Sequence, residues 1–344
     1  MLNIVGIMYT LKQLPEDFIV REVSNVSIKD SGKYTYVKIK KKNRNTVDVV
    51  KELAKQLRIK ENTIGFAGSK DRNAVTEQLC SVFNVGKERL KDVTIDNVTI
   101  ECVGHGNIPI SLGDLEGNKF EIVVRNLDNI SVEKISFVEN YFDEQRFSKN
   151  NARIGKNLIK KEFSEAVKLI DNRRVQEHMP KTDSIGALRK LPLRMVRMYI
   201  NAYQSYLWNE VVAEYLKSKG TIVKEIDYSL GTFIFVKDNG NLAGKKIPII
   251  GFGSKEFESE DIKPLIQNIM NKERITYTDF IIKQIPELTL EGILRDVFVK
   301  VQDMSVGKVE NDELNSGKKK IKVVFTLPKG SYATMVIRKM FGAT

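Results

Sequence analysis

Residues 65–78 read Gly65-Phe66-Ala67-Gly68-Ser69-Lys70-Asp71-Arg72-Asn73-Ala74-Val75-Thr76-Glu77-Gln78. The apolar run Ile64 to Ala67 predicts a short buried strand, and Val75 to Val82 predicts a second one. The polar residues between them form a glycine-containing loop, so Asp71 is expected at a strand end, where catalytic side chains are commonly displayed. Its neighbours Lys70 and Arg72 favour an ionised carboxylate and can hold phosphate. Taken alone, however, an aspartate in such a turn more often bonds its own backbone.

The segment from Tyr34 to Lys42 alternates as a strand with two different faces. One face can meet a core; it holds Thr35, Val37 and Ile39. The other face combines aromatic rings with ammonium groups; it holds Tyr34, Tyr36, Lys38 and Lys40. Such a face suits stacking on bases and contact with phosphates, and it is equally compatible with a solvated sheet surface.

Other segments carry clear helix and strand signals. Thr46 is expected as the N-cap of an amphipathic helix that runs to about Arg58, with Val49, Val50, Leu53 and Leu57 on one face. Further strands are expected over Val93 to Val103, Phe120 to Val124 and Val323 to Leu327. Helices are expected over Val132 to Phe142 and over 195–219, and a final helix is expected to begin after an N-cap at Ser331 and to end at Phe341. The polar stretch 148–157 suggests a boundary, and Gly307 to Lys320 reads as a mobile hairpin or loop. The middle third is thus predicted as an insertion between two αβ pieces.

Composition limits the classes of function. The 344 residues include 56 Lys and Arg against 44 Asp and Glu, a net charge of +12 that favours a polyanionic partner, first of all a nucleic acid. No apolar run is long enough for a membrane span and the N-terminus lacks a signal-peptide pattern, so we expect a cytoplasmic protein with no membrane partner.

The rare side chains argue against several chemistries. Cys80 and Cys102 give neither a disulfide scaffold nor a zinc motif. His105, in a predicted loop, and His178, at a predicted helix end, are expected to be structural or exposed, which leaves no metal site. Phosphate-binding and dinucleotide-binding glycine motifs are also missing from the sequence.

Five motifs, in order along the chain, closely resemble those of the TruD family of tRNA pseudouridine synthases. They are Pro15-Glu16-Asp17-Phe18, residues 65–78, Gly113-Asp114-Leu115-Glu116-Gly117-Asn118-Lys119-Phe120, Asn140-Tyr141-Phe142 with Gln145-Arg146-Phe147, and Leu327-Pro328-Lys329-Gly330-Ser331-Tyr332-Ala333-Thr334. Two positions depart from the family pattern. Asn73 stands where many relatives carry His or Arg, and Tyr332 replaces the Phe of several relatives.

The resemblance implies an α+β fold with a pseudouridine-synthase-type catalytic domain, built on a mixed, largely antiparallel sheet with flanking helices. Residues 1–152 and 306–344 would form this domain, and residues 153–305 would form an inserted TruD-specific α/β domain. The usual substrate of the family is uridine 13 of tRNA. The sequence does not fix the oligomeric state and is compatible with a monomer.

The resemblance also assigns roles to individual residues. It makes Asp71 the catalytic aspartate and places Phe18, Asn118 and Tyr332 where the family holds the target nucleotide. Lys12, Glu16 and Phe120 match polar and aromatic positions of the pocket. As phosphate contacts we expect Lys70, Arg72, Lys38 and Lys40.

The chemistry fits a single carboxylate. Pseudouridine formation breaks the N1–C1′ bond, turns the uracil and joins C5 to C1′, so it requires no redox or energy cofactor. A carboxylate can attack an electrophilic carbon or take up a proton, and the sequence leaves open whether Asp71 attacks C1′, attacks C6 or deprotonates the sugar. A non-catalytic tRNA-binding protein is the alternative. A carboxylate-dependent nuclease would need several clustered acids for a metal.

Overall fold

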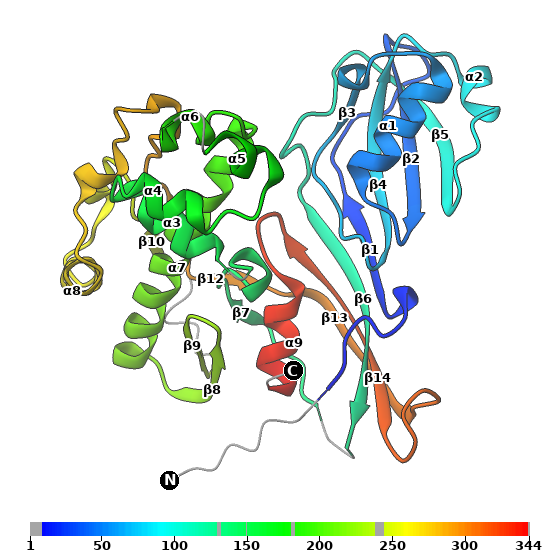
Figure 1. Ribbon diagram of the computed structural model, residues 1–344. Helices are drawn as coiled ribbons and strands as arrows, with labels where there is room; N and C mark the ends of the chain where they lie inside the picture. Colours follow the sequence, from blue (N-terminus) through cyan, green and yellow to red (C-terminus); the bar gives the residue numbers. More distant parts are fainter. Residues whose placement is uncertain (1–8, 129–131, 149, 180–182, 238–243, 343–344) are drawn as a thin grey trace. The chain divides into compact units, whose positions relative to one another are not determined.

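The computed structural model describes residues 9–128, 132–148, 150–179, 183–237 and 244–342. The chain divides into two compact units (Figure 1). Unit 1 comprises Met1–Ser136, Lys300–Ala333 and Met340–Thr344, and unit 2 comprises Phe137–Val299 and Thr334–Lys339. These divisions fall at different positions from the expected domain limits at 152/153 and 305/306.

Unit 1 is built around one large mixed sheet with the strand order β13-β14-β6-β1-β4-β2-β5, and β3 pairs with β4. Its strands are β1 (Phe18–Val23), β2 (Tyr34–Lys42), β3 (Ile64–Phe66), β4 (Val75–Phe83), β5 (Val98–Gly106), β6 (Gly117–Leu127), β13 (Gln302–Asn311) and β14 (Lys319–Pro328). Only β1 and β4 pair in parallel; every other pair in this sheet is antiparallel. The expected α+β class with a mixed, largely antiparallel sheet and flanking helices is confirmed.

Helix α1 (Thr46–Leu57) covers one face of the strands β2, β4 and β5 (Figure 1). Its expected apolar face is buried against these strands, so this prediction is confirmed. Thr46 is not the N-cap, however, because Asn45 occupies that position and the Thr46 hydroxyl bonds elsewhere. The remaining helical elements of unit 1 are α2 (Lys87–Lys91), η1 (Pro15–Asp17) and η2 (Glu61–Thr63).

The two faces of β2 differ less than the sequence suggested. Thr35, Val37 and Ile39 are buried, as expected. Tyr36 is buried as well, because the segment before β6 covers it and its hydroxyl donates a hydrogen bond to the Ile108 carbonyl at 2.8 Å. His105 lies in β5 rather than in a loop, with Nδ1 3.2 Å from the Thr35 hydroxyl.

A buried ion cluster ties η1 to the far end of the sheet. The guanidinium of Arg125 on β6 contacts Asp17 with Nε at 2.9 Å and Asp312, in the turn between β13 and β14, with Nη1 at 2.8 Å. Burial opposes ionisation of Asp312, but hydrogen bonds from the Asn126 amide, Asn315 and Arg125 lower its pKa to about 2. The antiparallel pairing of β13 with β14 confirms the expected hairpin over 307–320, and its turn is held by the ion pair of Asp312 with Arg125.

Unit 2 is mainly helical, with α7 (Leu193–Lys219) as its longest element. Its other helices are α3 (Asn151–Ile159), α4 (Phe163–Lys168), α5 (Arg173–His178), α6 (Ser184–Leu188) and α8 (Lys263–Glu273), with the short turns η3 (Glu144–Arg146), η5 (Ser254–Phe257), η6 (Tyr277–Phe280) and η7 (Pro286–Leu288). Its short strands are β7 (Phe137–Glu139), β8 (Ile222–Tyr228), β9 (Gly231–Val236), β10 (Lys246–Pro248), β11 (Leu294–Asp296) and β12 (Phe298–Lys300). The helix expected over 195–219 is confirmed as α7, and Tyr199, Tyr203 and Leu207 on it are buried.

The helix expected over Val132 to Phe142 is wrong. This segment contains strand β7, which pairs with β12, and the Asn140 amide donates to the Val297 carbonyl at 2.8 Å. Glu139 is buried and accepts a hydrogen bond from the Val236 amide. Partners far along the chain therefore decide this backbone conformation. The polar stretch 148–157 is mostly the start of α3, although residue 149 lies outside the described residues.

The final helix, α9 (Ala333–Phe341), follows the turn after β14. It begins close to the expected N-cap at Ser331, so the predicted C-terminal helix is confirmed. Its residues Thr334–Lys339 are grouped with unit 2.

Candidate active site

Asp71 lies in the loop between β3 and β4, as the sequence predicted. About a third of its side chain is exposed, and Oδ2 is 2.6 Å from the Lys12 ammonium. The same ammonium lies 4.1 Å from the centre of the Phe18 ring. Charge-assisted hydrogen bonds of this length orient a carboxylate strongly. The loop therefore presents an oriented and accessible carboxylate.

Three of the other expected pocket residues lie on one face of the sheet. In the register of β1 and β6, Val20 lies opposite Phe120 and Glu22 lies opposite Asn118, while on β14 Leu327 lies opposite Asn118. Side chains two residues apart on a strand share a face. Phe18, Phe120 and Asn118 are thus brought together on the face that Lys12 also contacts.

Phe18 and Phe120 are more deeply buried than a base-stacking role requires. Their exposed fractions are 3% and 7%, and their rings meet edge to face at 6.2 Å. The Lys12 ammonium covers the Phe18 ring. In this structure both rings are core residues that form the floor below Lys12, and a base could stack on Phe18 only if Lys12 moved.

Asn118 carries an unused acceptor. Its Oδ1 atom is buried and has no hydrogen-bond partner among the described residues. Buried polar atoms normally find a partner, so an orphan of this kind calls for an explanation such as a bound ligand. Tyr332, half-buried, follows the end of β14.

The expected phosphate contacts separate into two groups. Arg72 and Lys40 are exposed, and Lys38 is partly exposed at 3.9 Å from Glu77. Lys70 does not fit the expectation, because its side chain is buried in an ion pair with Glu22 at 2.6 Å. Its charge is already compensated inside the protein, and it fixes the loop to β1.

Glu16 forms an ion pair with Lys42. This contact lowers the pKa of the Glu16 carboxyl. Both side chains are about half exposed, and Lys42 is the last residue of β2.

Sequence reasoning missed two buried charged residues beside this loop. Glu22 holds Lys70, and the ammonium of Lys41 donates hydrogen bonds to loop carbonyls. The signal for Lys41 was available, since it continues the inward series Thr35, Val37 and Ile39 on β2.

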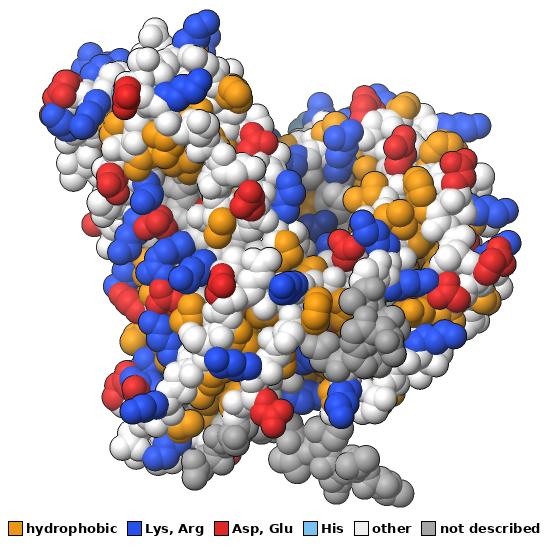
Figure 2. Space-filling view, turned by 180° about the vertical axis from the view of Figure 1, so that it is seen from behind, with side chains coloured by type: hydrophobic (Ala, Val, Ile, Leu, Met, Phe, Trp, Pro, Cys, Tyr) orange, Lys and Arg blue, Asp and Glu red, His pale blue; other side chains and the backbone are white. Residues whose placement is uncertain are grey.

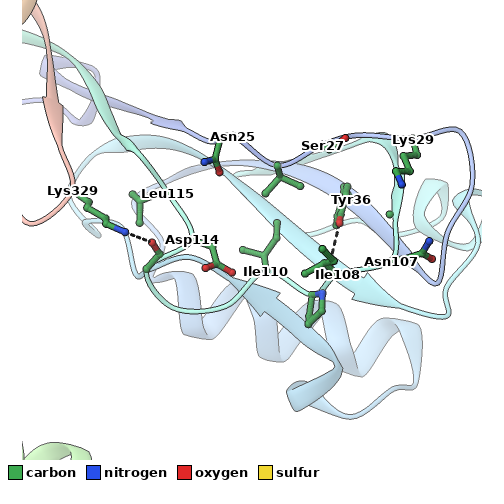
Figure 3. Close-up of a pocket in the computed structure, with 14 residues that line it drawn as sticks. Asn25, Ser27, Lys29, Tyr36, Asn107, Ile108, Ile110, Asp114, Leu115 and Lys329 are labelled. Carbon is green, nitrogen blue, oxygen red and sulfur yellow. Dashed lines mark hydrogen bonds between the residues drawn. The ribbon is translucent and has the colours of Figure 1, made fainter.

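A cavity of about 550 Å³ lies beside the loop segment 107–116 (Figure 3). Lys329 and Lys29 flank it at opposite ends, with Asp114 and Asn25 between them. Lys329 donates a hydrogen bond to the Gly113 carbonyl at 2.9 Å, and the Gly113 amide donates to the Ala67 carbonyl. The cavity thus adjoins the start of the Asp71 loop but contains none of the residues expected in the pocket.

Figure 2 shows Lys and Arg side chains spread over the displayed face, with acidic side chains among them. Within the described ranges there is no group of three or more His, Cys, Asp or Glu side chains that could hold a metal ion. No helix in these ranges has the length and apolar character needed to cross a membrane.

Comparison with known proteins agrees with this architecture. The family model for tRNA pseudouridine synthase D (TruD) matches residues 1–181 and 169–340. A protein named probable tRNA pseudouridine synthase D 1 of Methanococcus maripaludis is 31% identical over 96% of this chain and 98% of its own length. The tRNA pseudouridine synthase D of Aquifex aeolicus is 30% identical over 96% of this chain and 97% of its own length.

The fold is shared with a solved structure. The crystal structure of a putative tRNA pseudouridine synthase D from Methanosarcina mazei superposes with a TM-score of 0.72 at 24% identity, covering 99% of this chain and 95% of that one. The family model and the relatives together define an RNA-modifying isomerase. The chain belongs to the TruD family of tRNA pseudouridine synthases.

Proposed function

We propose that this chain converts uridine 13 of tRNA to pseudouridine, with Asp71 as the catalytic carboxylate and without a cofactor. The observation that carries the proposal is the state of Asp71: an accessible carboxylate bound by Lys12, on a loop whose neighbouring Lys70 is buried in an ion pair with Glu22. Unit 1 would be the pseudouridine-synthase-type catalytic domain, because every expected site residue lies in it. Unit 2 would correspond to the inserted TruD-specific domain.

The reaction needs a carboxylate that can approach C1′ or C6 of a flipped-out uridine, since neither carbon is reachable while the base is stacked in RNA. Asp71 meets this need because it combines exposure with a fixed position. Lys12 must yield part of its contact when the nucleotide enters. Its own side chain is 24% exposed, so it has a path toward solvent.

The detached uracil must also be retained while it turns. Uracil N3–H is a donor, and the unpartnered Oδ1 of Asn118 is an acceptor of suitable chemistry. The buried rings of Phe18 and Phe120 support the floor from below. In the proposed site, Tyr332 contributes the stacking face, because the residue is only half-buried.

Site-resolved detection of pseudouridine in a tRNA transcript tests the proposal. We expect modification of uridine 13 by the wild-type chain in excess chelator, and none by Asp71→Asn. Asp92→Asn is a matched control, because Asp92 is exposed at the end of α2. Modification at another uridine would contradict the position, and an active Asp71→Asn variant would show that Asp71 is not the catalytic carboxylate. Binding of tRNA with no modification by the wild-type chain would favour the non-catalytic alternative.

A further inference from the structure

Lys41 is the most unusual charged residue of unit 1. It continues the inward face of β2, lies opposite Thr76 of β4, and has an exposed fraction of 1%. Its ammonium donates hydrogen bonds to three backbone carbonyls: Arg44 at 2.6 Å, Asp71 at 2.7 Å and Lys70 at 3.3 Å. An ammonium has three protons to donate, so these contacts use its full capacity.

Burying a cation against carbonyl groups alone is unfavourable compared with burying an apolar residue. Burial lowers the pKa of Lys41 to about 8, although the Asp71 carboxylate acts in the opposite direction. Stability alone therefore gives no reason for a lysine here. Two of the three carbonyls belong to residues 70 and 71, so the contacts serve the loop that carries Asp71.

Two further buried side chains hold the same loop. The Thr46 hydroxyl accepts a hydrogen bond from the Lys70 amide at 3.0 Å and donates to Oε1 of Gln78 at 2.9 Å. Nε2 of Gln78 donates to the Gly68 carbonyl at 3.1 Å. Thr46 and Gln78 are buried, so water cannot easily replace these bonds.

We propose that Lys41 is a positioning residue for the isomerisation, which fixes the backbone at residues 70 and 71 so that the Asp71 carboxylate is held in its reactive place. This inference rests on the proposed role of Asp71. Lys12 and Lys41 have different roles. Lys12 binds the Asp71 carboxylate and can move aside for the substrate, whereas Lys41 binds the loop backbone and stays in place. Thr46 and Gln78 complete the fixed part of the loop.

The experiment compares Lys41→Met, which keeps the apolar stem, with Lys41→Arg, which keeps a cationic donor, and with Lys55→Met at an exposed position of α1. A misplaced catalytic group costs about a hundredfold in rate, so we expect kcat of Lys41→Met to fall by about that factor. KM for tRNA should stay within about threefold, because phosphate contacts elsewhere anchor the RNA. Lys41→Arg should recover part of kcat, and Lys55→Met should match wild type.

A second pair of variants tests the fixed loop in case Lys41→Met does not fold. Thr46→Val removes the hydroxyl at constant shape, and Thr46→Ser restores it; we expect kcat to fall in the first and recover in the second. Thermal melting gives the folded fraction of every variant. If Lys41→Met and Thr46→Val keep wild-type kcat per folded molecule, or change only KM, the inference is overturned. An active Asp71→Asn variant would instead refute the proposed function, so the two failures are distinguishable.

Discussion

Two buried charged groups, one in each unit, have different roles. In unit 2, Glu139 and Lys339 form a closed pair at 3.1 Å with both side chains buried. In unit 1, Lys41 is bound to carbonyls of the loop that ends in a partly exposed carboxylate. A closed pair favours one packing arrangement, whereas a cation on backbone carbonyls fixes the path of a loop. The difference separates charges that maintain a core from charges that prepare a reactive group.

The largest expected effect comes from removing one acid in each unit. Asp71→Asn should lower turnover by about a thousandfold or more, because catalysis by a positioned carboxylate is lost, with little change in melting temperature.

Glu139→Gln should leave turnover per folded molecule unchanged and reduce the free energy of unfolding by about 3–5 kcal/mol, because Lys339 is left buried without a counter-charge. Single-turnover kinetics and thermal melting check both. If both variants lose turnover per folded molecule, or both lose only stability, the two acids do not have the different roles proposed for them.

The second-largest effect is expected from Phe18→Ala, which should lower the free energy of unfolding. Phe18 is buried against Phe120, and truncating a buried phenylalanine costs about 3–5 kcal/mol. Turnover should also fall, because the floor below Lys12 is lost. Urea unfolding and turnover per folded molecule separate the two effects. Unchanged stability would show that the ring is not core and that it is free to stack on the base.

The pH dependence of unit 1 should reflect Asp312. Its folded-state pKa, about 2, lies below the ordinary value of 3.8, so the stability it contributes is present above pH 4 and is lost as the pH falls toward 2. From this shift we expect Asp312→Asn to be less stable than wild type by about 2 kcal/mol at pH 7. The gap should close on acidification. A gap that stays constant down to pH 2 would rule out this charge as its origin.

The smallest effect is expected from Tyr332→Phe. The ring remains, and the change removes only a hydroxyl, so turnover should stay within about threefold of wild type. Tyr332→Ala removes the stacking face and should cost about tenfold to a hundredfold. Steady-state rates of the two variants provide the measurement. Equal losses in both would indicate that the hydroxyl, rather than the ring, is the important group.

The sequence was sufficient where local patterns decide the structure. Alternation predicted β2, the apolar stripe predicted α1, and the glycine-containing turn placed Asp71 correctly between the two strands β3 and β4. It failed for β7, because the strand exists through pairing with β12 and through the burial of Glu139. It also failed for Lys70, whose burial depends on Glu22 in another strand.

The site residues show the same limit. Motifs pointed to Asp71, and the structure places Lys12, Phe18, Phe120 and Asn118 near one another in a way that no local pattern specifies. Lys41 shows what a strand pattern can still contribute. Lysines are almost never fully buried unless a polar group pairs with them. A lysine at an inward position of a strand therefore indicates that a polar partner lies nearby.

The order of strands in unit 1 has a consequence for the newly synthesised chain. Strand β6 lies between β1 and β14, and Asn118 reaches its neighbour Leu327 only after residues 137–299 have left the ribosome. Until then one long edge of β6 is unpaired, and exposed strand edges invite aggregation. Folding of unit 1 should therefore finish late, with β14 closing the edge and completing the neighbourhood of Asn118 in a single step.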